Sequence, residues 1–313
     1  MDTIATLEKI RSNIERALVG KREIIDLVLT AVLARGHVLI EDVPGIGKTT
    51  LVRALAASLS CSFQRIQFTP DVMPSDVTGF SMVDLQSGEL RFKPGAIMNQ
   101  IILADEINRT SPKTQSCLLE VMQEGQVTVD GNSYTVPKPF VVLATQNPVE
   151  HVGTYALPEA QLDRFFIRIS LGYPDLHEEM KILERHDTES APISALESVV
   201  TADEVLELQA ATDAVSCSEK IREYIAMIVG QTRAIKDLSL GASPRAGISL
   251  MRGAKAWALL QGRDFVTPDD VLRMVTPVLA HRLLLRPEAR LKDMTAERIL
   301  KNITNMVRVP DEN

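Results

Sequence analysis

The sequence predicts an α/β protein in which a doubly wound parallel sheet, with helices on both faces, is followed by an all-helical domain. Three observations carry this prediction. Short apolar runs alternate with helical segments through residues 37–170, a glycine-rich turn links the first run to a helix, and strand-like runs stop after residue 175.

Five apolar runs have the length and composition of strands buried on both faces of a parallel sheet. They are HVLIE (37–41), SFQRIQF (62–68), QIILA (100–104), FVVLA (140–144) and FFIRIS (165–170). Helices are expected at 48–59, at 112–122 and, from its apolar stripe, at 21–35. Gly36 is the expected C-terminal cap of that last helix.

Two insertions near 80–92 and 126–136 break the alternation. The second alternates about Asp130–Gly131, a strong hairpin signal. Both are expected to be hairpins, either as plain surface loops or as projections that grip another molecule.

A domain boundary is expected at Gly172–Asp175, which gives an α/β domain over 1–173 and a helical domain over 174–313. Capping boxes at Thr201, Ser216 and Thr267 predict helix starts in the second domain.

The bulk composition favours a cytoplasmic protein. The 313 residues carry a net charge of −7 and include no run of Lys and Arg, which disfavours a nucleic-acid partner. Three dispersed cysteines suit a reducing compartment. No apolar stretch is long enough for a membrane span, and no signal peptide is expected.

The turn between the first strand and its helix has the form of a P-loop, whose backbone N–H groups and helix N-terminus cradle phosphates. Lys48 should reach the β- and γ-phosphates, and the Thr49 hydroxyl should bind Mg²⁺. Asp42 replaces the first glycine of the pattern and is expected to face away from the phosphates. The candidate binding residues are Pro44, Gly45, Ile46, Gly47, Lys48, Thr49 and Thr50.

Two further strands end in polar residues that should reach the same edge of the sheet. The run 101–104 ends in Asp105, a candidate Mg²⁺ ligand, and Glu106, a candidate general base for the attacking water. The run 140–144 leads to Asn147, which either binds the γ-phosphate or the water, or lies in an ordinary Asn-Pro turn.

Together these motifs resemble the MoxR family of AAA+ ATPases. The matching segments are EDVPGIGKT, RIQFTPDVMPSDVTGF, ILADEINR, VMQEGQVTVDG, ATQNPVE and LPEAQLDRF, within residues 19–260.

The resemblance implies roles for single residues. Asn147 matches sensor 1, and Arg245 in GASPRA matches sensor 2, a lid arginine that contacts the γ-phosphate. Arg164 matches the arginine finger that enters a neighbouring subunit's site, with Arg109 and Arg168 as the other candidates.

The resemblance also places Val19–Gly20 at the adenine pocket and suggests that Gln67 restrains Glu106 as a switch residue. It implies that both insertions face a ring pore or a client.

The function implied is Mg²⁺-dependent ATP hydrolysis by a homo-oligomer, expected as a hexameric ring. The ring would remodel protein clients together with a von Willebrand factor A-domain partner. Two alternatives stay open at this point: a nucleic-acid motor of the same superfamily, and a nucleotide-gated scaffold with little turnover.

Overall fold

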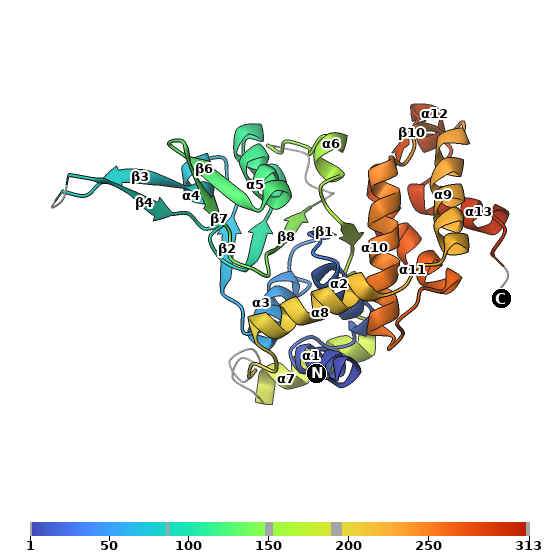
Figure 1. Cartoon of the computed structure of the whole chain (residues 1–313), viewed down its shortest axis with the longest axis horizontal. Coiled ribbons are helices and arrows are strands. Elements are labelled where there is room, and N and C mark those ends of the chain that lie inside the picture. The colour runs from blue at the N-terminus through green and yellow to red at the C-terminus, as the bar shows by residue number, and fades with distance from the viewer. Residues whose placement is uncertain (1, 86–87, 148–152, 189–195, 311–313) are drawn as a thin grey trace.

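A computed structural model of the chain describes residues 2–85, 88–147, 153–188 and 196–310 (Figure 1). The strands are β1 Val38–Glu41, β2 Phe63–Gln67, β3 Gly79–Val83, β4 Leu90–Pro94, β5 Ile101–Asp105, β6 Gln126–Val129, β7 Asn132–Thr135, β8 Val141–Gln146, β9 Ile167–Ile169, β10 Leu238–Leu240 and β11 Leu284–Leu285. The helices before β9 are α1 Thr3–Glu15, α2 Arg22–Leu33, α3 Lys48–Ser58, α4 Pro74–Thr78, the 3-10 turn η1 Ile107–Arg109, α5 Pro112–Glu124 and α6 Glu159–Leu162. Those after it are α7 Leu176–Thr188, α8 Ala202–Ala214, α9 Glu219–Ala234, α10 Pro244–Leu260, α11 Pro268–Leu279, the 3-10 turn η2 Ala280–Arg282, α12 Pro287–Arg290 and α13 Ala296–Met306.

The main sheet has the strand order β2-β5-β8-β1-β9, and every pairing in it is parallel. The predicted parallel sheet is therefore confirmed. Its middle strands β5 and β8 are buried almost throughout, as the expected continuous apolar runs require. Burial of β2 on both faces was a wrong expectation, because β2 is an edge strand and its Gln64, Arg65 and Gln67 are exposed.

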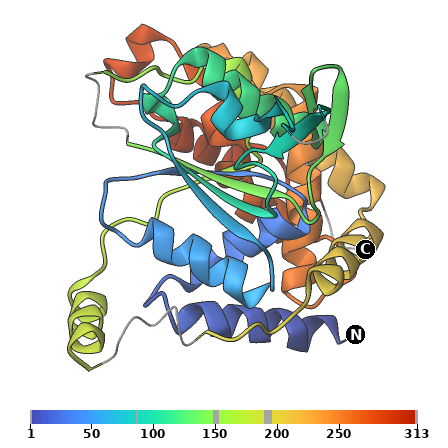
Figure 2. The ribbon, with the colours of Figure 1, turned by 90° about the vertical axis from the view of Figure 1, so that its left-hand side faces the viewer.

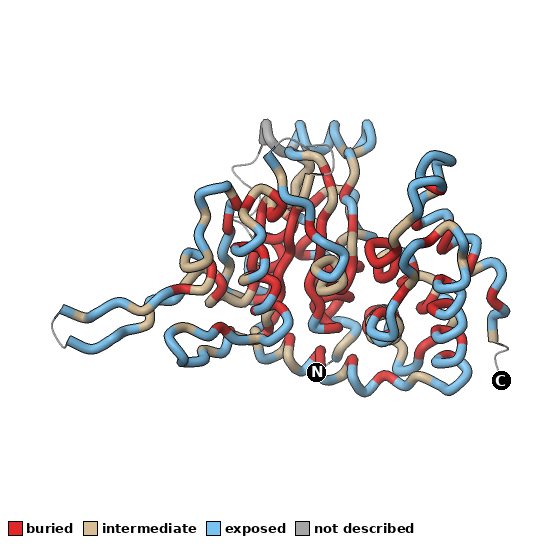
Figure 3. The backbone as a smooth tube through the Cα atoms, turned by 90° about the horizontal axis from the view of Figure 1, so that it is seen from above, coloured by how far each residue is buried: buried red, intermediate tan, exposed pale blue. Residues whose placement is uncertain are grey.

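Alternate residues of each strand supply two separate apolar cores. Val38 and Ile40 of β1 pack in the core that α1, α2 and α3 help to build, whereas Leu39 packs in the core that contains Leu118 and Leu119 of α5. Figure 3 shows these buried segments running through the middle of the molecule. Helices on both faces thus fix where the strand ends lie.

The two insertions are hairpins. β3–β4 extends well away from the body, while β6–β7 lies nearer to it (Figure 1). Asp130 and Gly131 both have positive φ, as the tight turn between β6 and β7 requires. The rings of Phe92 and Tyr134 stack with centroids 3.9 Å apart, so the hairpins touch at their bases.

The region after β9 is helical apart from the short antiparallel pair β10–β11. Helix α10 packs against α11, α9 and α2, and α8 also contacts α2. Figure 2 shows α7, at residues 176–188, standing apart from the helices that follow it. We place the proposed division at 173/174, after the last strand of the main sheet.

Two local expectations were wrong for identifiable reasons. Helix α9 begins at Glu219 with Ser218, not Ser216, as its N-cap, because Ser216 instead pairs with Phe265 in a β-bridge. The predicted C-terminal cap of α2, Gly36, does not have the left-handed backbone, which is found instead at Arg35 (φ 51°). Gly36 is required for packing. A Cβ on Gly36 would lie 2.3 Å from the Phe166 ring, so close packing requires the glycine.

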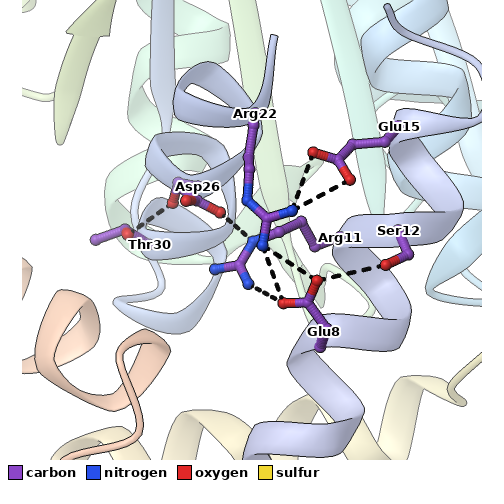
Figure 4. A network of polar contacts seen from close by, with 7 residues as sticks. All are labelled: Glu8, Arg11, Ser12, Glu15, Arg22, Asp26 and Thr30. Atoms are coloured by element: carbon purple, nitrogen blue, oxygen red, sulfur yellow. Dashed lines mark hydrogen bonds and ion pairs between the residues drawn. The ribbon is translucent and has the colours of Figure 1, made fainter. Parts of the chain in front are cut away.

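Helix α1 is pinned to α2 by a charged network (Figure 4). The nearly buried Arg11 donates from Nε to Asp26 at 2.5 Å and also bonds Glu8, which in turn accepts from Arg22 at 3.1 Å. Removing one partner of such a buried pair leaves an uncompensated charge, so loss of either Arg11 or Asp26 should destabilise the fold. The network joins helices α1 and α2 across the loop that carries Val19 and Gly20.

No helix in the described parts of the chain is both long enough and apolar enough to cross a bilayer.

Candidate active site

A cavity of about 370 Å³ lies where β1, β5 and β8 end. Its lining contains residues from three segments that the sequence analysis predicted separately: the glycine-rich turn, the Asp–Glu strand end and Asn147. The lining residues are Pro44, Gly45, Gly47, Lys48, Thr49, Thr50, Arg65, Gln67, Asp105, Glu106 and Asn147.

The glycine-rich turn has the backbone that a P-loop needs. Gly45 and Gly47 have φ of 87° and 93°, a region that favours glycine, and a Cβ on Gly45 would meet nothing within 4 Å. Helix α3 starts at Lys48, so its unpaired N–H groups face the cavity. This arrangement suits a phosphate group.

Asp42 does face away from the cavity. Its Oδ2 accepts hydrogen bonds from Ser170 Oγ at 2.9 Å, from Gly172 N at 3.0 Å and from Leu171 N. The carboxylate therefore ties the start of the P-loop to the segment after β9. Replacement of the usual glycine leaves the phosphate cradle open.

The Lys48 ammonium donates to the carbonyl oxygens of Asp42 at 2.9 Å and Val43 at 3.2 Å. Partial burial lowers the pKa of Lys48, while the nearby carboxylates of Asp105, Asp42 and Glu106 oppose that shift. The ammonium thus bonds carbonyl groups of its own loop, at the edge of a site lined by acidic side chains. An anionic ligand in the cavity could replace these carbonyl groups as its partner.

Asp105 is held at both oxygens. Thr145 Oγ1 donates to its Oδ1 at 2.6 Å, and Arg65 donates to its Oδ2 from Nη2 at 2.6 Å and from Nε at 3.1 Å. Thr145 Oγ1 also accepts from the Glu106 backbone N–H at 2.9 Å, which locks the end of β5 to β8. Oδ2 of Asp105 is therefore already paired with a guanidinium cation.

The Glu106 carboxylate is restrained by two donors. Gln67 Nε2 donates to Oε2 at 2.9 Å, and Arg109 Nη1 donates to the same oxygen at 3.1 Å. The hydrogen bond from Gln67 has the geometry that the switch interpretation requires. Glu106 itself has a left-handed backbone, with φ of 57°, of the kind that gathers at functional sites.

Three predicted binding residues lie outside this cavity. Ile46 belongs to the P-loop but does not line it, and neither does Val19 or Gly20. The loop before α2 is nevertheless close, because Leu18 Cδ1 would lie 3.3 Å from a Cβ on Gly47. An adenine pocket at Val19–Gly20 stays a prediction.

Arg164 and Arg245 line a second cavity of about 280 Å³, away from the P-loop. Arg35, Arg252 and Arg282 line it too, so it is strongly cationic. Among the described residues, neither the Arg164 nor the Arg245 guanidinium has a hydrogen-bond or ion-pair partner.

The other two finger candidates are engaged elsewhere. Arg109 bonds Glu106 of its own chain, and Arg168 bridges Glu41 at 2.9 Å and Glu297 at 2.5 Å. Arg164 thus has the more available guanidinium.

Sequence reasoning missed Arg65 at the first cavity and Arg282 at the second. The segment RIQF contains Arg65 two positions before Gln67, so period-2 alternation would have placed both side chains on one face. Arg282 lies far from Arg164 in sequence, and no local pattern links them.

Comparisons with known proteins agree with the geometry. The family model "ATPase family associated with various cellular activities (AAA)" matches residues 37–167, and the "AAA lid domain" model matches residues 230–303. The chain is 51% identical to the protein YeaC of Bacillus subtilis over 304 residues, which are 97% of this chain and 95% of that one. It is 38% identical to Chaperone MoxR1 of Mycobacterium tuberculosis over 319 residues, which are 99% of this chain and 84% of that one.

A crystal structure of a Cytophaga hutchinsonii protein has a TM-score of 0.92 against this fold at 37% identity, over 99% of this chain and 96% of that one. By these likenesses and by its P-loop cavity, the chain belongs to the MoxR family of AAA+ ATPases.

Proposed function

We propose that the protein hydrolyses ATP with Mg²⁺ at a site shared by two copies of the chain, and that the cycle remodels protein clients. One observation carries the proposal most. The P-loop, both strand-end carboxylates and Asn147 line one cavity, whereas Arg164 and Arg245 line another, and their guanidinium groups have no partners among the described residues. A complete site then needs the second cavity of a neighbouring subunit.

Each side chain has a role that its position supports. Lys48 leaves the carbonyls of its own loop and bonds the β- and γ-phosphates. Glu106 takes a proton from the attacking water once it is released by Gln67, and Asn147 orients that water or the γ-phosphate. Arg164 and Arg245 of the neighbour neutralise charge that develops on the transferred phosphoryl group.

The residues present also fit a magnesium ion. A threonine hydroxyl at Thr49 and a carboxylate at Asp105 line the same cavity, and Mg²⁺ bound with a nucleotide needs only one or two protein oxygens. The Arg65 guanidinium on Asp105 supports this, because it is a cation that another cation could replace. Bound there, Mg²⁺ would neutralise charge on the β- and γ-oxygens.

Replacing Arg65 by Gln should make Mg²⁺ binding easier. The Arg65–Asp105 pair is 47% and 12% exposed at its two side chains. A part-exposed pair contributes about 1 kcal/mol, so the Mg²⁺ concentration that half-saturates the ATP complex should fall roughly fivefold. Titration of a fluorescent ATP analogue over a series of Mg²⁺ concentrations measures this, with exposed Arg53 on α3 as the Arg53→Gln control. A midpoint that rises would mean that Arg65 serves the nucleotide instead.

ATP hydrolysis itself is tested by substitution of Lys48. Lys48→Ala removes a charged donor to two phosphates, so affinity for ATP should fall on the order of 100-fold. Phosphate release should disappear with it. The exposed Lys236→Ala is the control and should bind and hydrolyse as the unsubstituted protein does. Unchanged ATP affinity in Lys48→Ala would refute the phosphate cradle.

The assembly and client remain proposals that rest on family likeness. A relative carries the name Chaperone MoxR1, which supports a remodelling role over a scaffold with little turnover. A hexameric ring and a von Willebrand factor A-domain partner are what the family resemblance implies. The cytoplasmic location expected from the sequence also stays a prediction.

The β3–β4 hairpin favours a protein client over nucleic acid. It presents exposed apolar side chains at Phe80, Met82, Val83, Leu85 and Leu90. ATPase activity stimulated by DNA would support the nucleic-acid motor instead.

A further inference from the structure

The proposed arginine finger, Arg164, lies on a short segment that contacts the helical domain 174–313, called the lid below. Arg164 lies between the end of α6 at Leu162 and the start of β9 at Ile167. Its own guanidinium has no partner among the described residues, so contacts of its neighbours set its direction. Those contacts come from the turn η2, which follows α11 in the lid.

Arg282 at the end of η2 grips this segment with its whole guanidinium. Its Nε donates to the Asp163 carboxylate at 2.7 Å, and its Nη2 donates to the carbonyl oxygens of Phe165 at 2.6 Å and Asp163 at 3.3 Å. Its Nη1 donates to the carbonyl oxygen of Phe166 at 3.2 Å and to that of Val278 in the preceding helix α11. The residues on both sides of Arg164 are therefore fixed by one lid side chain.

The neighbouring histidine adds to the grip. His281 Nε2 donates to the carbonyl oxygen of Phe165 at 3.1 Å, and its imidazole is buried, which lowers its pKa well below the ordinary value. A neutral ring thus serves as a hydrogen-bond donor rather than as a charge. Lid and finger segment are joined by two consecutive residues.

Burial makes the contact of Arg282 unusually dependent on its partners. Its side chain is only 3% exposed, and a buried guanidinium is tolerated only where paired and fully hydrogen-bonded. Burial lowers the pKa of Arg282, and the Asp163 carboxylate opposes that shift. If the segment moved away from η2, the buried Arg282 guanidinium would lose its partners and remain as an unpaired charge in the interior.

We propose that Arg282 is the positioning residue through which the lid aims Arg164 at the nucleotide of the neighbouring subunit. This inference rests on the proposed shared site. A lid movement in one subunit would then shift the finger offered to the next, so that hydrolysis in adjacent subunits is coupled through Arg282 and Asp163.

The first test is Arg282→Lys, which keeps the charge and loses the fork that reaches three carbonyl groups of the finger segment, those of Asp163, Phe165 and Phe166. A finger misplaced by an ångström costs on the order of 100-fold in rate, so turnover should fall roughly 10- to 100-fold. ATP affinity should stay within about twofold, because the subunit's own P-loop is untouched. Asp163→Ala cuts the same contact from the other side, at a carboxylate that is 26% exposed, and should give a similar loss in a folded protein.

Arg263 provides the matched control. It pairs with the buried Asp270 at 2.5 Å entirely within the lid and does not touch the finger segment. Arg263→Lys should perturb the lid to a similar degree and leave turnover nearly unchanged. An equal loss of turnover in Arg263→Lys would mean that Arg282 only stabilises the lid.

Mixed assemblies separate positioning from folding. Glu106→Gln subunits cannot hydrolyse but carry an intact finger, so adding them to Arg282→Lys subunits should raise turnover per Arg282→Lys subunit. A parallel mixture of Arg164→Ala with Glu106→Gln tests the shared site itself. Recovery in both mixtures supports the inference. Recovery with Arg164→Ala alone overturns it while the shared site stands, and recovery in neither overturns both.

Discussion

Arg164→Ala should leave ATP binding nearly intact and reduce turnover by about 10³-fold or more. The reason lies in the position of the side chain. Arg164 lines the arginine-rich cavity, and the P-loop cavity of its own subunit does not include it. In the proposed shared site this guanidinium serves a neighbour's nucleotide, and arginines supplied in this way act on the transition state rather than on ground-state binding.

The measurements are ATP affinity by fluorescence titration and phosphate release under saturating ATP. Arg222, exposed on α9, gives the control Arg222→Ala, which should behave as the unsubstituted protein. A rate that stays within a few-fold after loss of Arg164 would remove the finger from the mechanism, and Arg245 would then be the next residue to examine.

Glu106→Gln should bind ATP and fail to turn it over, with a rate lower by roughly 10²- to 10⁴-fold, the contribution expected from a general base. The amide has almost the shape of the carboxylate and cannot take a proton from water. Gln67 and Arg109, which both donate to Glu106, can still be accommodated by the remaining carbonyl oxygen. The substituted protein should therefore keep its fold and hold ATP.

This substitution also distinguishes an ATPase from a nucleotide-gated scaffold. In an ATPase, Glu106→Gln accumulates the ATP-bound state and should retain clients in a pull-down performed with ATP. Glu124, exposed at the end of α5, supplies the control Glu124→Gln. If Glu106→Gln changes neither turnover nor client retention, the result would support the scaffold interpretation and contradict the general-base role of Glu106.

Much of the P-loop cavity could be predicted from the sequence because its features are local. A strand, a glycine-rich turn and a helix follow one another around Lys48, and Asp105 ends a strand of its own. Parallel strands bring their carboxyl ends to one edge, so the meeting of Lys48 with Asp105 follows from topology. The outward direction of Asp42 was also expected, although its partners beyond β9 were not.

Other features depend on contacts that no local pattern encodes. Arg282 meets Asp163 across the boundary between lid and sheet, and the strand order leaves β2 at an edge where Arg65 is free to reach Asp105. The N-cap of α9 is Ser218 rather than the predicted Ser216, because Ser216 pairs with Phe265 in a β-bridge. In each case a tertiary contact outweighed a local preference.

The shared site is tested most directly by mixing two inactive proteins. Arg164→Ala subunits keep a working P-loop cavity, and Glu106→Gln subunits keep a working arginine cavity. Mixed assemblies should therefore release phosphate faster than either variant alone, with the gain appearing only under conditions where subunits exchange. Phosphate release that never exceeds the sum of the two separate variants would show that each chain completes its own site, and the account of two cooperating cavities would be wrong.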